Sequence, residues 1–228
     1  EAEGASFRDL VRLRRWTATQ DIALHLKIGG VEAVRDIKDA LDLGVEGLIA
    51  PMVESPFGVV KFVSAIESVF GLRKIHKSIN IETRGAVDQI DEILSVAQGK
   101  IDNVTVGRTD LSQSYFDSKT QPDSPFILDL IERLSYKIQA SGLTLTVGGS
   151  LTSESIRLFQ QRRDGLGNRV SSMETRKVVL PIEKMLEQEG ALKESLHFEE
   201  LYLRYKLECG AWLSRSDQER LDKLKTRL

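Results

Sequence analysis

The chain is poor in cysteine, in long apolar runs and in any excess of one charge. Its 228 residues include a single cysteine, Cys209, so no internal disulfide can form. No stretch approaches the roughly 20 apolar residues of a membrane-spanning helix, and the opening residues do not resemble a secretory signal. The net charge of −2 gives no electrostatic reason to expect nucleic acid or an anionic membrane as partner. These absences favour a cytoplasmic protein with a small-molecule ligand.

The composition, 41% hydrophobic and 29% charged, is typical of a globular protein with a large core. Apolar strand patterns alternate with helical periodicity at a spacing of roughly 25 residues, which predicts a parallel sheet. We interpret the strands as nearly continuous apolar runs, as in a sheet covered on both faces. A (β/α) barrel and a doubly wound sheet both fit. Strands are predicted at 22–28, 47–53, 78–83, 101–107, 143–147 and 169–180, and helices at 6–18, 31–44, 57–70, 84–97, 125–139 and 153–161.

A closed eight-strand barrel takes about 250 residues, whereas the strand pattern here ends near residue 180. Residues 1–4 are a candidate seventh strand, so we expect the first strand of a barrel to be incomplete or missing. Residues 1–180 are predicted to form the barrel domain, and 181–228 a C-terminal helical extension with helices at 182–190, 192–207 and 217–228. Its apolar side chains, Phe198, Tyr205 and Trp212 among them, are too many for a solvated tail. We expect them to pack on the barrel or, as we favour, on another subunit of a homo-oligomer.

Polar clusters follow three of the predicted strands, where a barrel has its active-site mouth. Lys27, Glu82 and Asp110 belong to these clusters. Carboxylates suit a divalent cation that leaves positions open for a small 2-oxo acid, so Glu82 and Asp110 are candidate ligands. A solvated loop acid or a helix cap is the alternative for each.

Three runs together resemble the HpcH/HpaI aldolase and citrate lyase β-subunit superfamily: Pro-Met-Val-Glu at 51–54, Ile-Glu-Thr-Arg at 81–84 and Gly-Arg-Thr-Asp-Leu at 107–111. The resemblance covers about residues 1–180. It implies a TIM (β/α)8-type barrel of the phosphoenolpyruvate/pyruvate kind. It also implies that Mg²⁺, or Mn²⁺ or Co²⁺, binds through the residues matching Glu82 and Asp110.

The chain departs from the family pattern at two positions. Lys27 stands about where the family has an arginine that binds the substrate carboxylate or enolate, and lysine keeps the charge without the two-pronged geometry. A solvated lysine and a Schiff-base lysine are the alternatives, although the latter would leave the two carboxylates without a purpose. A Gly-Glu-His run of the aldolases is replaced by Ala-Glu-Gly at 2–4, so Gly4 has no side chain to move a proton. Glu3, a metal-bound water or a substrate group would then take that role.

Further candidates lie near the same strand ends. Arg84 and Arg108 could clamp a carboxylate, Arg108 as a catalytic residue, or else form ion pairs around the rim. Glu54 is a candidate substrate ligand or a turn acid. The glycines of the 148–150 run expose backbone N–H groups that favour an anion, although a tight turn explains them equally well; this candidate comprises Gly148, Gly149 and Ser150. The charged run 174–177 either faces the mouth or contacts the tail, and His25, His76 and His197 are interpreted as structural or solvated.

The predicted function is a divalent-metal-dependent carbon–carbon lyase or aldolase that acts on pyruvate-like 2-oxo acids through a metal-stabilised enolate. One alternative is an acyl-CoA lyase of the citrate lyase β-subunit type. The other is a catalytically inactive 2-oxo acid binding or scaffold protein.

Overall fold

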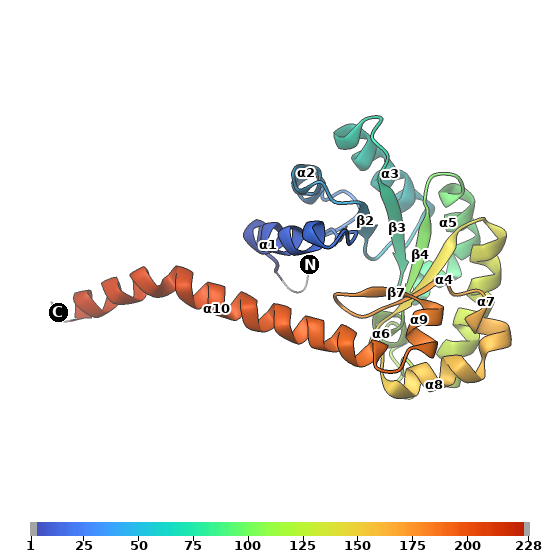
Figure 1. Cartoon of the computed structure of the whole chain (residues 1–228). Coiled ribbons are helices and arrows are strands. Elements are labelled where there is room, and N and C mark those ends of the chain that lie inside the picture. The colour runs from blue at the N-terminus through green and yellow to red at the C-terminus, as the bar shows by residue number, and fades with distance from the viewer. Residues whose placement is uncertain (1–3, 226–228) are drawn as a thin grey trace.

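The computed structural model describes residues 4–225 and contains one sheet curled into half a barrel (Figure 1). The sheet order follows the sequence, and each strand from β1 to β6 pairs in parallel with the next. β7 pairs antiparallel to β6, so β1 and β7 are the two edges of the sheet that the described residues form. The predicted α/β class is confirmed. The strands are β1 (His25–Lys27), β2 (Gly47–Ala50), β3 (His76–Ile81), β4 (Asn103–Gly107), β5 (Thr144–Gly148), β6 (Ser172–Glu174) and β7 (Val179–Pro181).

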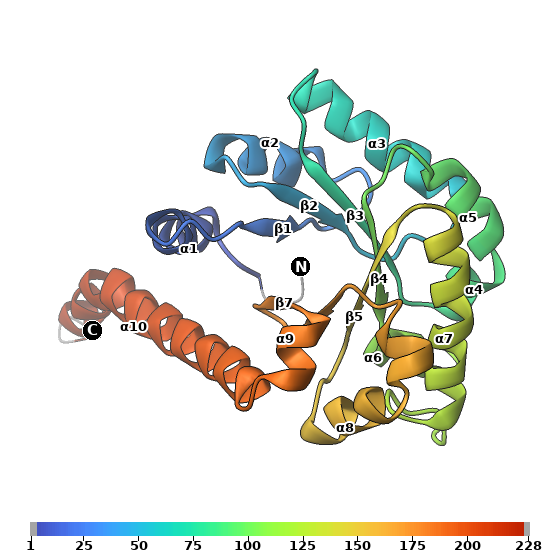
Figure 2. The ribbon, with the colours of Figure 1, turned by 45° about the vertical axis from the view of Figure 1, so that its right-hand side comes forward.

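Helices cover the convex face of the sheet (Figure 2). Several begin at a residue that suits the N-cap: Ser6 and Thr152 form capping boxes, and Ser55 precedes a proline at the first helical position. Gly44 ends its helix with a φ of 62°, which glycine adopts without strain. The helices are α1 (Phe7–Thr19), α2 (Val34–Leu43), α3 (Pro56–Phe70), α4 (Arg84–Asp88), α5 (Ile90–Ala97), α6 (Arg108–Gln113), α7 (Pro125–Ala140), α8 (Ser153–Gln161), the π-helix η1 (Arg163–Gly167), α9 (Ile182–Glu187) and α10 (Ala191–Lys225).

The two faces of the sheet differ in chemistry, which corrects our interpretation of the strands as continuous apolar runs. On β3, β4 and β5 apolar residues alternate with polar ones, and the apolar set belongs to the core. The polar set bonds to itself across strands: the Asn103 amide donates to Ser78 Oγ at 2.8 Å, while its oxygen accepts from Thr144 Oγ1 at 2.9 Å and Thr146 Oγ1 at 3.1 Å. Because these buried groups satisfy one another, the concave face can be polar.

Two expectations about secondary structure were wrong. The last strand, expected over 169–180, is a hairpin of β6 and β7, each three residues long. The helix expected over 84–97 is two helices, α4 and α5, joined at Gln89. The strand expected at 1–4 is not tested, since residues 1–3 lie outside the described residues.

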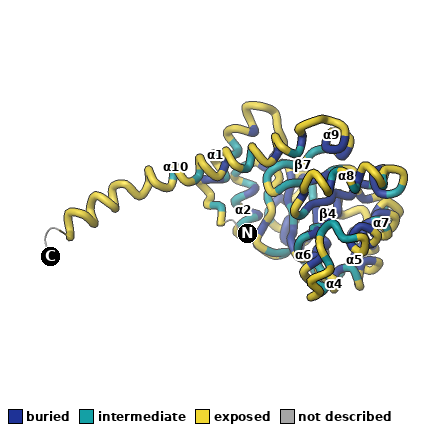
Figure 3. Tube along the Cα trace, turned by 90° about the horizontal axis from the view of Figure 1, so that it is seen from below, coloured by how far each residue is buried: buried dark blue, intermediate teal, exposed yellow. Residues whose placement is uncertain are grey.

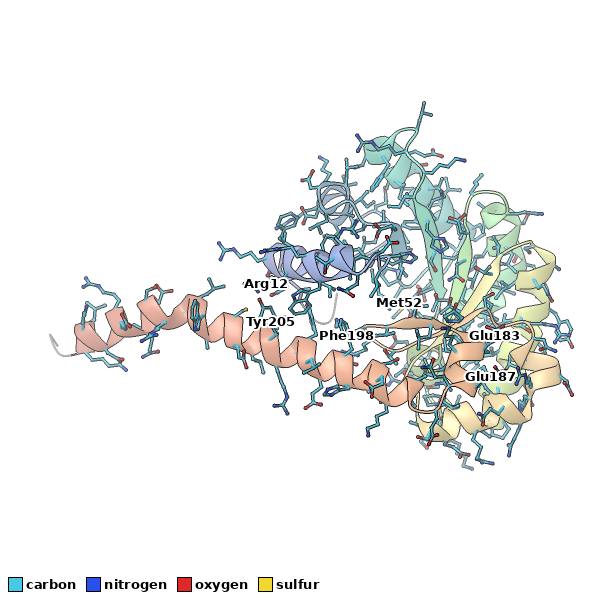
Figure 4. The ribbon with its side chains drawn as sticks, viewed as in Figure 1. Arg12, Met52, Glu183, Glu187, Phe198 and Tyr205 are labelled. Atoms are coloured by element: carbon cyan, nitrogen blue, oxygen red, sulfur yellow. The ribbon has the colours of Figure 1, made fainter. Side chains whose placement is uncertain are left out.

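The C-terminal extension also differs from expectation, because α10 is one continuous helix of 35 residues. Its first half contacts the domain: Tyr202 is buried, and the rings of Tyr205 and Trp16 have centroids 4.8 Å apart. Figure 4 shows Tyr205 and Phe198 on the side of α10 that faces α1. The second half projects into solvent (Figure 3), where Trp212 is 84% exposed.

Within residues 4–225, no helix combines the length and the apolarity that crossing a bilayer requires.

Candidate functional site

The site is built on the concave face, at the carboxyl ends of β3 to β6. Glu82 directly follows β3, and only 4% of its surface is exposed. Its Oε1 accepts a hydrogen bond from the Met52 backbone N–H at 2.8 Å, and its Oε2 accepts one from Asn80 Nδ2 at 3.2 Å. Both donors are neutral, so within the described part of the chain the carboxylate is held in place without a cationic side chain.

Met52 donates to Glu82 from an unusual backbone conformation. Its φ is 49°, in the left-handed region that non-glycine residues rarely adopt. Such local strain persists where the surrounding structure demands it, and it concentrates at functional sites. Here it turns the chain after β2 so that a backbone donor points at Glu82.

A second glutamate, Glu174, ends β6 on the same face. It belongs to the charged run 174–177, for which the mouth was one of two expected positions, but it is not one of the candidate site residues. Ile81 is in register with Val106, Val106 with Val147, and Val147 with Met173. The residues that follow these four therefore lie side by side across the sheet, as a row that we call the carboxylate shelf: Glu82, Gly107, Gly148 and Glu174. The signal in the sequence was the alternation Ser172-Met173-Glu174, which places Glu174 on the face of Ser172, opposite the buried Met173.

The two glycines of the carboxylate shelf make room for the two glutamates. A Cβ on Gly107 would lie 2.6 Å from Glu82 Oε2, and a Cβ on Gly148 would lie 2.5 Å from Glu174 Cγ and 2.8 Å from its Oε1. Each glutamate thus leans inward over the neighbouring glycine. Because neighbouring strands lie about 4.8 Å apart, the two carboxylates approach each other above the middle of the row.

The electrostatics support the same convergence. The pKa of Glu174 is raised to about 7: burial is the largest cause, Lys27 acts to lower the pKa, and the negative charge of Glu82 acts to raise it. The charges that act on Glu174 therefore come from Lys27 on β1, at the far edge of the sheet, and from Glu82 after β3. They are close enough to do so because the sheet is curled. Among the described residues, the Glu174 carboxyl has no hydrogen bond or ion pair, in contrast to Glu82.

The other predicted metal ligand, Asp110, is exposed in the first turn of α6, three residues beyond Gly107. Lys27 is exposed at the end of β1. Beneath Glu82, the buried Asn80 Oδ1 has no hydrogen-bond partner among the described residues. Within that same part of the chain, no group of three or more His, Cys, Asp or Glu side chains is arranged to hold a metal ion.

Arg108 lies below this face rather than in the open mouth. Its fully buried guanidinium donates to the carbonyls of Gly148, at 3.1 Å, and Gly149, at 2.7 Å, and pairs with Asp123. Asp123 in turn accepts from Ser155 Oγ at 2.8 Å. Arg108 therefore fixes the turn after β5, a role that its position after a strand did not indicate.

The turn that Arg108 holds contains the predicted anion cradle. Gly149 has a φ of 88°, and a Cβ there would lie 2.6 Å from the Thr109 backbone nitrogen, so only glycine fits. Ser150, with a φ of 50°, places its hydroxyl 2.9 Å from Thr109 Oγ1. Both hydroxyl residues line a cavity of about 520 Å³ beside the loop 112–122.

The remaining candidates lie apart from the carboxylate shelf. Arg84 is exposed, 3.8 Å from Asp88. Glu54 is also exposed, and its backbone carbonyl accepts from Gln89 Nε2 at 2.9 Å. Glu3 lies outside the described residues.

Comparison with known proteins identifies the family. A family model for HpcH/HpaI aldolase/citrate lyase matches residues 9–147, more than half of the chain. The chain belongs to this family. The match includes Lys27, Glu82 and Asp110, and it confirms the resemblance inferred from the three runs. No curated protein sequence matches the chain significantly.

Solved structures show the same fold at low sequence identity. The HpcH/HpaI aldolase from Desulfitobacterium hafniense DCB-2 has a TM-score of 0.58 and 20% identity, with 70% of each chain covered. An HpcH/HpaI aldolase/citrate lyase family protein from Burkholderia cenocepacia J2315 gives 0.57 and 18%, over 68% of this chain and 70% of that one. A citrate synthase variant, SbnG, gives 0.55 and 23%, over 70% and 68%. Family membership thus indicates a lyase or aldolase built on the barrel architecture.

Proposed function

We propose that the chain is a divalent-cation-dependent carbon–carbon lyase or aldolase that cleaves or forms 2-oxo acids of the pyruvate type. The observation that carries the proposal is the buried Glu82 carboxylate, which accepts hydrogen bonds from Met52 and Asn80 and forms no ion pair with any residue between 4 and 225. The names in the family and among the similar structures support this chemistry, since aldolases, citrate lyase and citrate synthase all break or make a carbon–carbon bond.

The residues at the mouth fit a hard divalent cation. Glu82 lies against Gly107, the N-cap of α6, and Asp110 stands in the first turn of that helix, three residues further along the chain. Mg²⁺ in particular binds through one or two carboxylates and leaves its other positions to water and substrate. We therefore assign Glu82 and Asp110 as its ligands. When bound, the cation supplies the positive charge that stabilises an enolate.

The chain's own residues would bind and orient the substrate. Lys27 adds a positive charge on the β1 side, where a substrate carboxylate can pair with it. The Ser150 and Thr109 hydroxyls and the N–H groups of the 148–150 turn are donors for the far end of the substrate. Arg108 acts as a positioning residue, because it holds the carbonyls of that turn from below.

The test combines binding with an exchange reaction. Calorimetry with Mn²⁺ and pyruvate, followed by NMR of solvent deuterium entering the pyruvate methyl group, should show cation-dependent binding and exchange. Glu82→Gln and Asp110→Asn should lose both while keeping their circular dichroism spectra. Glu183→Gln, an exposed glutamate on α9 (Figure 4), is the matched control. Full exchange in both site variants would refute the assignment, and binding without exchange in the parent chain would instead identify a ligand-binding protein.

We further propose that the protein is cytoplasmic.

We also propose that a second copy of the chain covers the distal half of α10. At 1.5 Å per residue, the 35 residues of α10 span about 50 Å, and the distal part of the helix projects away from the domain (Figure 3). Leu207 and Trp212 on this helix are 75% and 84% exposed. An antiparallel pair of these helices would bury the same residues from both copies. Light scattering should then give at least twice the monomer mass of 25.5 kDa, and a monomer mass would exclude the pairing.

A further inference from the structure

We propose that Glu174 is the residue that moves the proton during carbon–carbon cleavage, an assignment that rests on the lyase activity proposed above. Nothing in the motifs that identify the family extends to β6, since the family match ends at residue 147. The assignment comes from the geometry of the carboxylate shelf.

The chemistry requires one group that both takes and returns a proton. In a 4-hydroxy-2-oxo acid, a base takes the hydrogen of the C4 hydroxyl, and the O–H electron pair forms the new C4=O bond. The C3–C4 bond breaks, its electron pair forms C2=C3, and the C2=O π pair moves onto the keto oxygen. When the enolate collapses, C3 takes the proton, so pyruvate and an aldehyde are released and the base is ionised again. No oxidant or second substrate is needed.

Glu174 occupies the position from which this transfer can occur. Its carboxylate leans over Gly148, one strand spacing from the glycine under Glu82, so a substrate held beside Glu82 lies next to it. Gly148 is the reason that it fits, because a Cβ there would collide with Glu174 Cγ at 2.5 Å. The charged groups that face it are Lys27 from β1 and Glu82 from β3.

The hydrogen bonding separates the roles of the two glutamates. Glu82 accepts two hydrogen bonds that fix its orientation, as a cation ligand requires. The Glu174 carboxyl has none among the described residues, so its oxygens are available to a substrate hydroxyl. A proton-transfer residue must lie within about 2.6–3.2 Å of the group it serves, and an unbonded carboxyl at the mouth can reach that distance.

The experiment compares two reactions of one protein loaded with Mn²⁺. Deuterium exchange at the pyruvate methyl group needs a protein base, whereas decarboxylation of oxaloacetate generates the enolate by loss of CO₂ and needs none. Glu174→Gln should lower exchange by about 10²–10⁴-fold and decarboxylation by far less. Glu174→Asp should restore part of the exchange, and Mn²⁺ affinity measured by calorimetry should stay within about threefold of the parent. Glu183→Gln serves as the surface control.

Each result decides between the assignments. Exchange within threefold of the parent in Glu174→Gln would overturn the proposal. Equal loss of both reactions, or Mn²⁺ binding weakened more than tenfold, would overturn it as well and identify Glu174 as a cation ligand. A parent chain that decarboxylates nothing and exchanges nothing would refute the lyase function itself, which Glu82→Gln and Asp110→Asn test independently.

Discussion

Replacing Glu174 by glutamine should make the protein more stable at neutral and alkaline pH. In the folded chain the pKa of Glu174 is raised from 4.5 to about 7, by burial first and by Glu82 second. The folded state therefore holds a proton that the unfolded state releases, so the free energy of unfolding falls as pH rises from 4.5 through 7. At about 1.36 kcal/mol per pKa unit the full effect is about 3 kcal/mol, and about 2.5 kcal/mol of it falls between pH 5 and pH 8. Glutamine removes this loss because it carries no charge.

Urea titrations of parent and variant at pH 5, 6, 7 and 8, with EDTA to remove cations, measure the effect. The difference in unfolding free energy should move in favour of Glu174→Gln by about 2–3 kcal/mol from pH 5 to pH 8. Groups present in both proteins, such as the hydrogen-bonded Asp9, cancel in the difference. Glu183→Gln should follow the parent across the series. A difference that stays constant within about 0.5 kcal/mol would show that Glu174 is not held in a low-polarity, negatively charged setting.

Three other changes test the site and the assembly. Gly107→Ala should weaken Mn²⁺ binding at least about tenfold by calorimetry, because the new Cβ would lie 2.6 Å from Glu82 Oε2, and unchanged affinity would contradict the close packing of that glutamate. Arg108→Leu should lower the unfolding free energy by about 3 kcal/mol in urea titrations, since it leaves Asp123 and two carbonyls without their donor; a loss below 1 kcal/mol would argue against the buried pair. Trp212→Ser should shift the light-scattering mass to that of a monomer, and an unchanged oligomer would move the interface away from distal α10.

The strand and helix alternation was predictable because each unit is long enough to show its period. The helix expected at 153–161 has the bounds of α8, and the strand expected at 101–107 contains β4. The hairpin of β6 and β7 was missed because strands of three residues are shorter than the four to eight that a periodic pattern needs. The break before residue 217 is expected because Ser214 and Ser216 are N-cap candidates, whereas α10 runs through both of them. The helix also includes Gly210, which costs only about 1 kcal/mol inside a helix. Ser214 Oγ instead donates to the Gly210 carbonyl within the helix.

The sequence predicts which residues follow the ends of strands. It does not predict which other residues form hydrogen bonds and ion pairs with them. Glu82 is expected at the carboxyl end of a strand, and it directly follows β3. Arg108 also follows a strand, yet its partners Asp123 and Gly148 are 15 and 40 residues away, and only the fold shows that they bury it. Glu174 required both the alternation within β6 and the register from β3 to β6, which no local pattern contains.

The cost of Glu174 and the role proposed for it have the same physical origin. The Glu174 carboxyl is partly buried beside Glu82, and it has no hydrogen bond among the described residues. Ionisation of this carboxyl therefore destabilises the folded chain. Natural proteins keep such groups mainly where function needs them, and removing them commonly raises stability at the expense of activity. The same substitution should therefore move stability and deuterium exchange in opposite directions. If Glu174→Gln stabilised the protein and left exchange intact, the buried charge would need another explanation. If it lowered both, Glu174 would be a structural residue whose contacts matter more than its charge.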